Sequence, residues 1–358
     1  MKLRLAMNIN SIAGAYGGGN IFANFVERAM QAHGHEVFRS LVPGLDLILI
    51  VSSNYHPATS SFSVQDILAY REANPQTVVL HRVNTSDEAR GVNGGLNQAV
   101  QFAFTAADHV VFVSQFIRDL FISHGYDPQR PHSIITTGSD ERIFYPDVNS
   151  DWVVDTPLRI VTHHWSNNYL KGFDIYQRLD EMLAQSSFRQ RFSFTCIGRL
   201  PIGVQLSNST VLPPLPPSDL GSTLRQHHVY LSAARYEAAG NHFIEGMRCG
   251  LPILYLNSGS LPEYAAPFGL GFTLNSFPDR LAEMPIRYAE LRAKALQCPY
   301  TADLMTNNYV SLMLRLVEER RCRPLASPSF STLAHYRLTK ARRKLGRIRR
   351  RLCKLICG

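Results

Sequence analysis

The chain has 358 residues, of which 45% are apolar and 18% are charged. This balance is typical of a soluble globular protein and excludes wholesale disorder, and the length predicts two domains of about 150 residues each. The six cysteines form no Cys-x-x-Cys pair, which excludes a disulfide scaffold and indicates a reducing compartment.

The net charge of +9 is concentrated at one end of the chain. Residues 335–358 contain ten of the 37 Lys and Arg residues and no Asp or Glu, so the other 27 basic residues nearly balance the 28 acidic ones. A basic body that binds nucleic acid is therefore disfavoured, and we expect no nucleic-acid partner. The N-terminus does not resemble a signal peptide and the apolar runs are of strand length, which predicts a cytoplasmic protein.

Short apolar runs alternate with helical patterns from the N-terminus onward, which predicts β-α-β units around a parallel sheet. The runs are continuous, as buried parallel strands are. Expected strands cover residues 3–7, 47–51, 78–81, 109–113 and 133–135, and expected helices cover residues 21–32, 64–72 and 115–124. We expect these elements to form a first Rossmann-like domain over residues 1–150.

The periodicity lapses over residues 145–157, where polar and proline residues predict a linker. A second series of expected strands follows at residues 158–162, 192–197, 229–231 and 253–256. The fold class is therefore predicted to be α/β, with a second Rossmann-like domain over residues 157–300. A helical pattern at residues 301–320 is expected to close that second domain.

Open α/β sheets bind ligands at the carboxyl ends of their strands, and two such domains in series create a cleft. After the first expected strand come Gly17, Gly18 and Gly19, whose backbone N–H groups can bind an anion. A tight turn from the strand into the helix is an equally good explanation of the three glycines. His81 stands where a strand ends, as a ligand contact or as a buried, satisfied histidine. Lys171 precedes a helix, a place that the helix dipole disfavours unless an anion is present, and a solvated surface lysine is the alternative.

The most informative segment contains two glutamates eight residues apart. Glu237 and Glu245 flank Gly240 and Asn241, which stand at a plausible helix start. A carboxylate at the cleft end of that helix can accept both vicinal hydroxyls of a ribose, and Glu237 on the preceding loop can reach a second polyol. Two ordinary surface glutamates remain the alternative.

This segment resembles the signature of the family 4 glycosyltransferases, also called group 1, which have the GT-B fold. The matching residues are Glu237, Glu245, Cys249 to Pro252, the strand at 253–256, Ser258 to Ser260, and Pro262-Glu263, together with Gly17 to Gly19, His33 to Val37 and His109 to Ser114. The resemblance covers roughly residues 1–320. It implies a donor cleft between two Rossmann-like domains, with the acceptor set mainly by the first domain.

The resemblance also implies roles for particular residues. Glu245 would bind the ribose of a nucleotide-diphosphate sugar, Glu237 the hydroxyls of the donor sugar, and Lys171 the leaving diphosphate. His81 would lie near the anomeric centre. Further donor contacts are expected from the glycine loop, Gly17, Gly18 and Gly19, and from Asn241, Ser258 and Gly259.

The implied reaction is the transfer of a sugar, with retention of configuration and without a metal, from a UDP- or GDP-linked donor. The implied acceptor is a saccharide or a lipid-linked glycan used in cell-envelope or surface polysaccharides. No cofactor beyond this co-substrate is expected, and no metal ligand is assigned. The alternatives are a degenerate GT-B-fold protein that binds nucleotide sugar or glycan without transfer, and a GT-B-fold sugar-nucleotide epimerase.

One departure from the family lies ahead of Lys171. The family usually carries a Gly-Arg pair about six residues before the lysine, whereas this chain has His163, His164, Trp165 and Ser166. We expect His164 to substitute for the arginine, or Arg199 to approach from the neighbouring strand.

The basic C-terminal segment, residues 335–358, is predicted to form an amphipathic helix. Apolar residues recur at spacings of three and four, with Lys and Arg on the other faces, at Leu338, Ala341, Leu345, Ile348, Leu352 and Leu355. This pattern is typical of a helix that binds an anionic membrane surface, here the inner face of the membrane. A helix docked on the body, a coiled coil and a nucleic-acid-binding tail are the alternatives.

Overall fold

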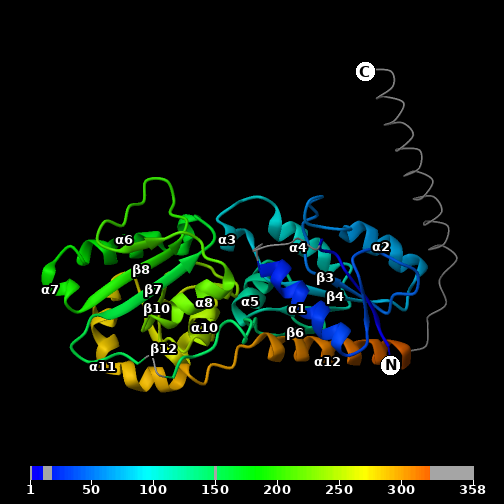
Figure 1. Ribbon diagram of the computed structural model, residues 1–358. Coiled ribbons are helices and arrows are strands. Elements are labelled where there is room, and N and C mark those ends of the chain that lie inside the picture. The colour runs from blue at the N-terminus through cyan, green and yellow to red at the C-terminus, as the bar shows by residue number, and fades with distance from the viewer. Residues whose placement is uncertain (1, 11–17, 149–150, 323–358) are drawn as a thin grey trace, which may run out of the picture.

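The computed structural model describes residues 2–10, 18–148 and 151–322. The basic segment at 335–358 and Gly17 lie outside the described residues. Within that part of the chain the strands form two parallel six-stranded sheets, each in its own lobe (Figure 1). This arrangement is the GT-B architecture of two Rossmann-like sheets that the sequence predicts.

The first sheet has the strand order β2-β1-β3-β4-β5-β6, and every neighbouring pair is parallel. Its central strands are buried along their whole length, which explains their unbroken apolar sequences. The strands are β1 (Arg4–Met7), β2 (Glu36–Phe38), β3 (Leu47–Ile50), β4 (Val78–Val83), β5 (His109–Phe112) and β6 (His132–Ile134).

The second sheet has the order β12-β11-β10-β7-β8-β9 and is also parallel throughout. The strands are β7 (Leu158–His164), β8 (Phe192–Gly198), β9 (Thr210–Leu212), β10 (Val229–Ser232), β11 (Ile253–Leu256) and β12 (Gly269–Phe272). Strand order changes direction beside β1 and β7, the two strands that each begin a lobe. In such sheets a crevice forms outside the carboxyl ends of the strands at this point, and both crevices contribute to the cavity described below.

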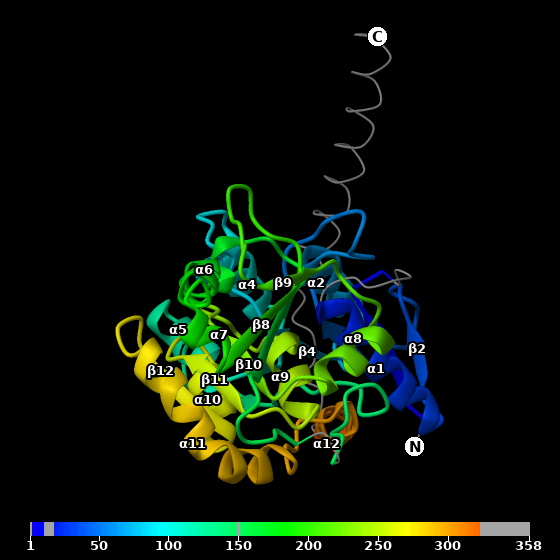
Figure 2. The same ribbon diagram turned by 60° about the vertical axis from the view of Figure 1, so that its left-hand side comes forward.

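Helices cover both faces of each sheet (Figures 1 and 2). In the first lobe they are α1 (Gly18–Ala32), α2 (Val64–Ala73), α3 (Asp87–Arg90), α4 (Leu96–Phe104) and α5 (Gln115–Ser123). In the second they are η1 (Tyr169–Lys171), α6 (Phe173–Met182), α7 (Ser186–Arg189), α8 (Pro217–Arg225), α9 (Asn241–Arg248), α10 (Leu261–Ala265), η2 (Ala266–Phe268) and α11 (Phe277–Ala295), and the described chain ends with α12 (Ala302–Cys322).

Helix α12 does not close the second domain, and this corrects the expectation for residues 301–320. It crosses back and packs on the first lobe, as Figure 1 shows. Tyr309 of α12 meets the ring of Phe22 of α1 edge to face, with centroids 4.9 Å apart. Met305 and Met313 enter the same buried cluster. The apolar face of α12 is complementary to α1, a match between residues far apart in the chain that periodicity does not reveal.

The two lobes also contact each other through α10. The carboxylate of Glu263 accepts the backbone N–H groups of Gln115 at 2.8 Å and of Phe116 at 3.3 Å, at the start of α5. The hydroxyl of Tyr264 donates to the Val113 carbonyl oxygen at 2.5 Å. A negative charge at a helix N-terminus is favourable, so these contacts hold the lobes together beside the cavity.

Candidate active site

A cavity of about 650 Å³ lies between the two lobes. Its first-lobe wall comes from α1, from the segment after β4 and from the segment after β6. Its second-lobe wall comes from the segments after β7 and β10 and from the start of α9. The polar lining residues include Gly18, Asn24, Arg28, Asn84, Thr85, Arg90, Asp140, His163, His164, Asn168, Lys171, Glu237, Asn241, His242 and Glu245.

Lys171 is held at the cavity by a short helical turn after β7. Asn168 caps η1 by accepting the N–H of Leu170 at 2.9 Å. Gly172 then adopts a left-handed φ of 92°, and a Cβ atom there would lie 2.4 Å from the Cβ of Ala233. Glycine is therefore required at this point for the chain to turn into α6 with Lys171 facing the cavity.

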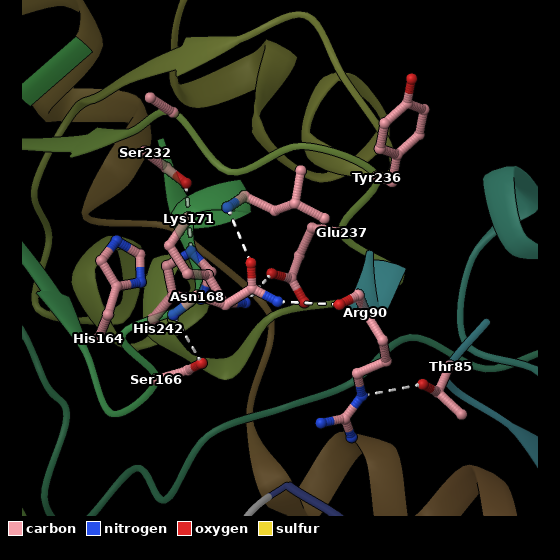
Figure 3. A network of polar contacts seen from close by, with 12 residues as sticks. Thr85, Arg90, His164, Ser166, Asn168, Lys171, Ser232, Tyr236, Glu237 and His242 are labelled. Atoms are coloured by element: carbon pink, nitrogen blue, oxygen red, sulfur yellow. Dashed lines mark hydrogen bonds and ion pairs between the residues drawn. The ribbon is translucent and has the colours of Figure 1, made fainter. Parts of the chain in front are cut away.

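The ammonium group of Lys171 forms an ion pair with Oε2 of Glu237 (Figure 3). Both side chains are mostly buried, with 22% and 16% of their surfaces exposed. A lysine at a helix start is disfavoured by the helix dipole, and the negative charge of Glu237 offsets this unfavourable interaction. In this structure the charges of Lys171 and Glu237 neutralise each other. An anion bound in the cavity would compete with the Glu237 carboxylate for the lysine.

The backbone of Glu237 is fixed from behind by the loop after β11. Ser260 donates its N–H to the Glu237 carbonyl oxygen at 2.8 Å, and Ser258 Oγ accepts the N–H of Tyr236 at 3.1 Å. A Cβ atom on Gly259 would lie 2.4 Å from the Glu237 nitrogen. Ser258 and Gly259 therefore support the Glu237 loop, and neither is among the residues that line the cavity.

Glu245 lies on the second turn of α9 and points into the cavity. Its Oε2 is 2.8 Å from Nε2 of His163 at the end of β7. Asn241, the first residue of α9, lies opposite Gly18, because a Cβ atom on that glycine would be 3.6 Å from the asparagine Nδ2. Gly18 of α1 and the N-terminus of α9 thus lie next to each other at the cavity, and a helix N-terminus favours an anion.

His164 and His242 are buried beside this pair, with ring centroids 4.6 Å apart. Burial holds the pKa of both imidazoles well below the usual value, so both are neutral at pH 7. His164 Nε2 meets the hydroxyl of Tyr176 at 2.8 Å, and its Nδ1 has no hydrogen-bond partner among the described residues. The sequence predicts that His164 stands in for an arginine, but a neutral ring supplies a hydrogen bond and no charge.

Three other predicted site residues lie away from the cavity. His81 is fully buried in β4, against the ring of Phe104 and with Nε2 2.8 Å from Ser53 Oγ. Burial lowers the pKa of His81 to about 3, so it is a neutral core histidine. Gly19 packs against Ile9 and Val51, and Arg199 is exposed beyond β8. These three residues are therefore not among those that line the cavity in this structure.

The structure adds first-lobe residues that sequence reasoning did not assign. Arg90 lines the cavity, and its Nε donates to Oγ1 of Thr85 at 3.3 Å. The Arg90 carbonyl oxygen accepts the Asn168 side-chain N–H at 2.9 Å, which joins α3 to the turn that holds Lys171 (Figure 3). Only the position of this segment after β4 could have indicated it, since strand ends at a crevice carry ligand contacts.

Among the described residues, no group of three or more His, Cys, Asp or Glu side chains is arranged to hold a metal ion. No described helix combines the length and the apolar character needed to span a bilayer.

Comparison with known protein families finds a match for one segment of the chain. Residues 205–302, which contain both Glu237 and Glu245, match the family model described as "Glycosyl transferases group 1". A comparison with curated proteins finds no match.

Solved structures share the two-lobed fold at low sequence identity. Sucrose-phosphate synthase from Thermosynechococcus elongatus is 14% identical with a TM-score of 0.62, over 89% of this chain and 100% of that one. HepE of Anabaena, in complex with UDP, is 15% identical with a TM-score of 0.63, over 88% and 100%. WaaG, a glycosyltransferase involved in lipopolysaccharide biosynthesis, is 16% identical with a TM-score of 0.60, over 87% and 99%.

The matched segment supplies the cavity wall that carries Glu237 and the start of α9, and the rest of the chain completes a two-lobed fold shared with glycosyltransferases. Residues 205–302 therefore carry the match to the group 1 glycosyltransferases, and the chain has the GT-B fold.

Proposed function

We propose that the protein transfers a sugar, with retention of configuration, from a UDP- or GDP-linked donor to a saccharide or lipid-linked glycan of the cell envelope or surface. The observation that carries the proposal is the second-lobe wall of the cavity, where Lys171, Glu237 and Glu245 converge. HepE has been crystallised with UDP-glucose, and a pneumococcal O-GlcNAc transferase with UDP and GlcNAc, which supports a uridine nucleotide as the first donor to test.

Each wall residue has a distinct task in this proposal. Glu245 accepts the ribose hydroxyls, and the neighbouring N-termini of α1 and α9 bind the phosphates. Lys171 leaves Glu237 and neutralises the diphosphate as the bond from the sugar to the phosphate oxygen breaks. Glu237, released from the lysine, accepts hydroxyls of the donor sugar. The acceptor oxygen bonds to the anomeric carbon from the same face, and its proton passes to the departing diphosphate.

The donor assignment is tested by thermal unfolding with UDP-, GDP-, ADP- and TDP-sugars, in EDTA, on the wild type and on Glu245→Ala. We expect one nucleotide class to raise the unfolding temperature by several degrees at about 100 times Kd. Glu245→Ala is expected to weaken that binding about 10- to 100-fold, because hydrogen bonds from the ribose to a carboxylate are lost.

The matched control is Glu181→Ala, an exposed glutamate on α6 of the same lobe. It should bind nucleotide as the wild type does. Unchanged affinity in Glu245→Ala would remove the ribose role. Binding without any sugar transfer would favour the degenerate binding protein, for which the neutral His164 at the diphosphate is the physical reason, and interconversion of free nucleotide sugars would favour the epimerase.

We further propose that the basic segment at 335–358, which lies outside the described residues, holds the enzyme at the inner face of a membrane. Each basic residue near an anionic leaflet contributes about 1 kcal/mol, and the segment contains ten. The full chain should pellet with phosphatidylserine vesicles at low salt, and a chain ending at residue 335 should not, while donor hydrolysis is unchanged. Pelleting of the shortened chain would refute the assignment, and neutral phosphatidylcholine vesicles serve as the control.

A further inference from the structure

His163 is the unusual neighbour of the proposed ribose site. It belongs to the segment, His163 to Ser166, that stands where the family usually has a Gly-Arg pair, and its side chain is only 4% exposed. Its Nε2 lies 2.8 Å from Oε2 of Glu245, whose side chain is 13% exposed. Because both side chains are nearly buried, their relative orientation is more restricted than that of an ion pair on the surface.

The imidazole of His163 is itself held from the other side by Tyr230 of β10. The phenol oxygen lies 3.2 Å from Nδ1 and 3.4 Å from the carbonyl oxygen of His163, and it accepts the His163 backbone N–H at 3.2 Å. Burial raises the pKa of Tyr230 well above its usual value, so the phenol keeps its proton and can donate to Nδ1. With Nδ1 accepting, the ring proton sits on Nε2, where it donates to Glu245.

We propose that His163 is a positioning residue for donor binding: by donating to Oε2 of Glu245 it holds the carboxylate in the orientation that receives the ribose of the nucleotide. This inference rests on the proposed function, in which Glu245 binds that ribose. A carboxylate has about four lone-pair sites, so the bond to His163 leaves Oε1 and one site on Oε2 for two vicinal hydroxyls. His163 itself does not contact the donor in this scheme.

The test separates the ribose from the rest of the nucleotide. Calorimetric Kd values are measured for UDP and for 2′,3′-dideoxy-UDP, or for the GDP pair if the donor panel selects guanine. His163→Ala should weaken UDP about tenfold and leave the dideoxy nucleotide within about twofold of the wild type. His163→Gln, which retains an N–H donor, should recover most of the UDP affinity.

Tyr230→Phe is the second variant, because it keeps the ring packing and removes only the hydroxyl that holds Nδ1. It should also lower the preference for UDP over the dideoxy nucleotide, by less than His163→Ala does. A loss that is equal for both nucleotides would show a merely structural role and overturn the inference.

The controls distinguish this inference from the proposed function. If Glu245→Ala abolishes the preference for UDP over the dideoxy nucleotide and His163→Ala does not, His163 has no positioning role and the ribose assignment stands. If Glu245→Ala also leaves that preference intact, the proposed ribose role of Glu245 is wrong. A wild type without ribose preference, or without affinity for either nucleotide, overturns both.

Discussion

Replacing Lys171 by alanine is expected to lower kcat for sugar transfer by about 10²- to 10³-fold, the usual cost of removing a group aimed at charge that develops in the transition state. Among the described residues of the second-lobe wall, Lys171 is the one Lys or Arg side chain. His164 and His242 add no charge there, because burial lowers the pKa of both. In the proposed reaction, the leaving diphosphate therefore depends on this ammonium group more than it would beside an arginine.

The measurement is single-turnover transfer at saturating donor, which reports the chemical step apart from binding. Lys294→Ala is the matched control, because Lys294 is an exposed lysine on α11 whose ion pair, within the described part of the chain, is with Glu290. Lys171→Arg should retain part of the rate, since it keeps the charge with a different shape. A decrease of less than about threefold in Lys171→Ala would mean that the diphosphate is neutralised elsewhere, with Arg90 of the first lobe the next residue to change.

Replacing Glu237 by glutamine is expected to change transfer and nucleotide binding in opposite directions. Transfer should fall by about 10²-fold, because the carboxylate that we propose receives the donor sugar is lost. UDP has no sugar at this place, and the ion pair with Lys171 no longer competes with its diphosphate. UDP should therefore bind about fivefold more tightly, which corresponds to about 1 kcal/mol for a partly exposed pair.

Calorimetry with UDP and kinetics with the UDP-sugar provide the two readings on the same preparation. Glu181→Gln, on the exposed face of α6, should change neither. Weaker UDP binding together with slower transfer would contradict the competition between Glu237 and the diphosphate, and would show that the Lys171–Glu237 pair instead holds the lysine in place for the donor.

Local sequence pattern identified most strands because a buried parallel strand needs a continuous apolar run. The expected run at 253–256 coincides with β11, and the expected runs at 47–51 and 109–113 differ from β3 and β5 by one residue. The pattern missed β12, where Gly269 and Gly271 interrupt four residues, and α11, which contains Pro285. Both elements are stabilised by packing against the rest of the second lobe, which overrides weak local propensity.

Glu237 and Glu245 were predictable because they are close in sequence, eight residues apart. Glu237 lies on the loop before α9 and Glu245 on α9 itself, so both reach the same cavity wall. His81 stands at the end of an expected strand, and Arg199 stands just beyond another, yet neither lines the cavity. Successive side chains on a strand point to opposite faces, so an expected strand end does not say which residue meets the ligand.

The sequence by itself therefore determined the α/β class, the two sheets and the short segment that carries Glu237 and Glu245, because each depends on neighbours within a few turns. Only the tertiary structure decided that α12 returns to the first lobe, that Lys171 pairs with Glu237, and that His163 bonds to Glu245. The last two pairs are separated by 66 and 82 residues. Such contacts form only when strand order brings distant chain segments to the same sheet edge, and no local periodicity encodes that order.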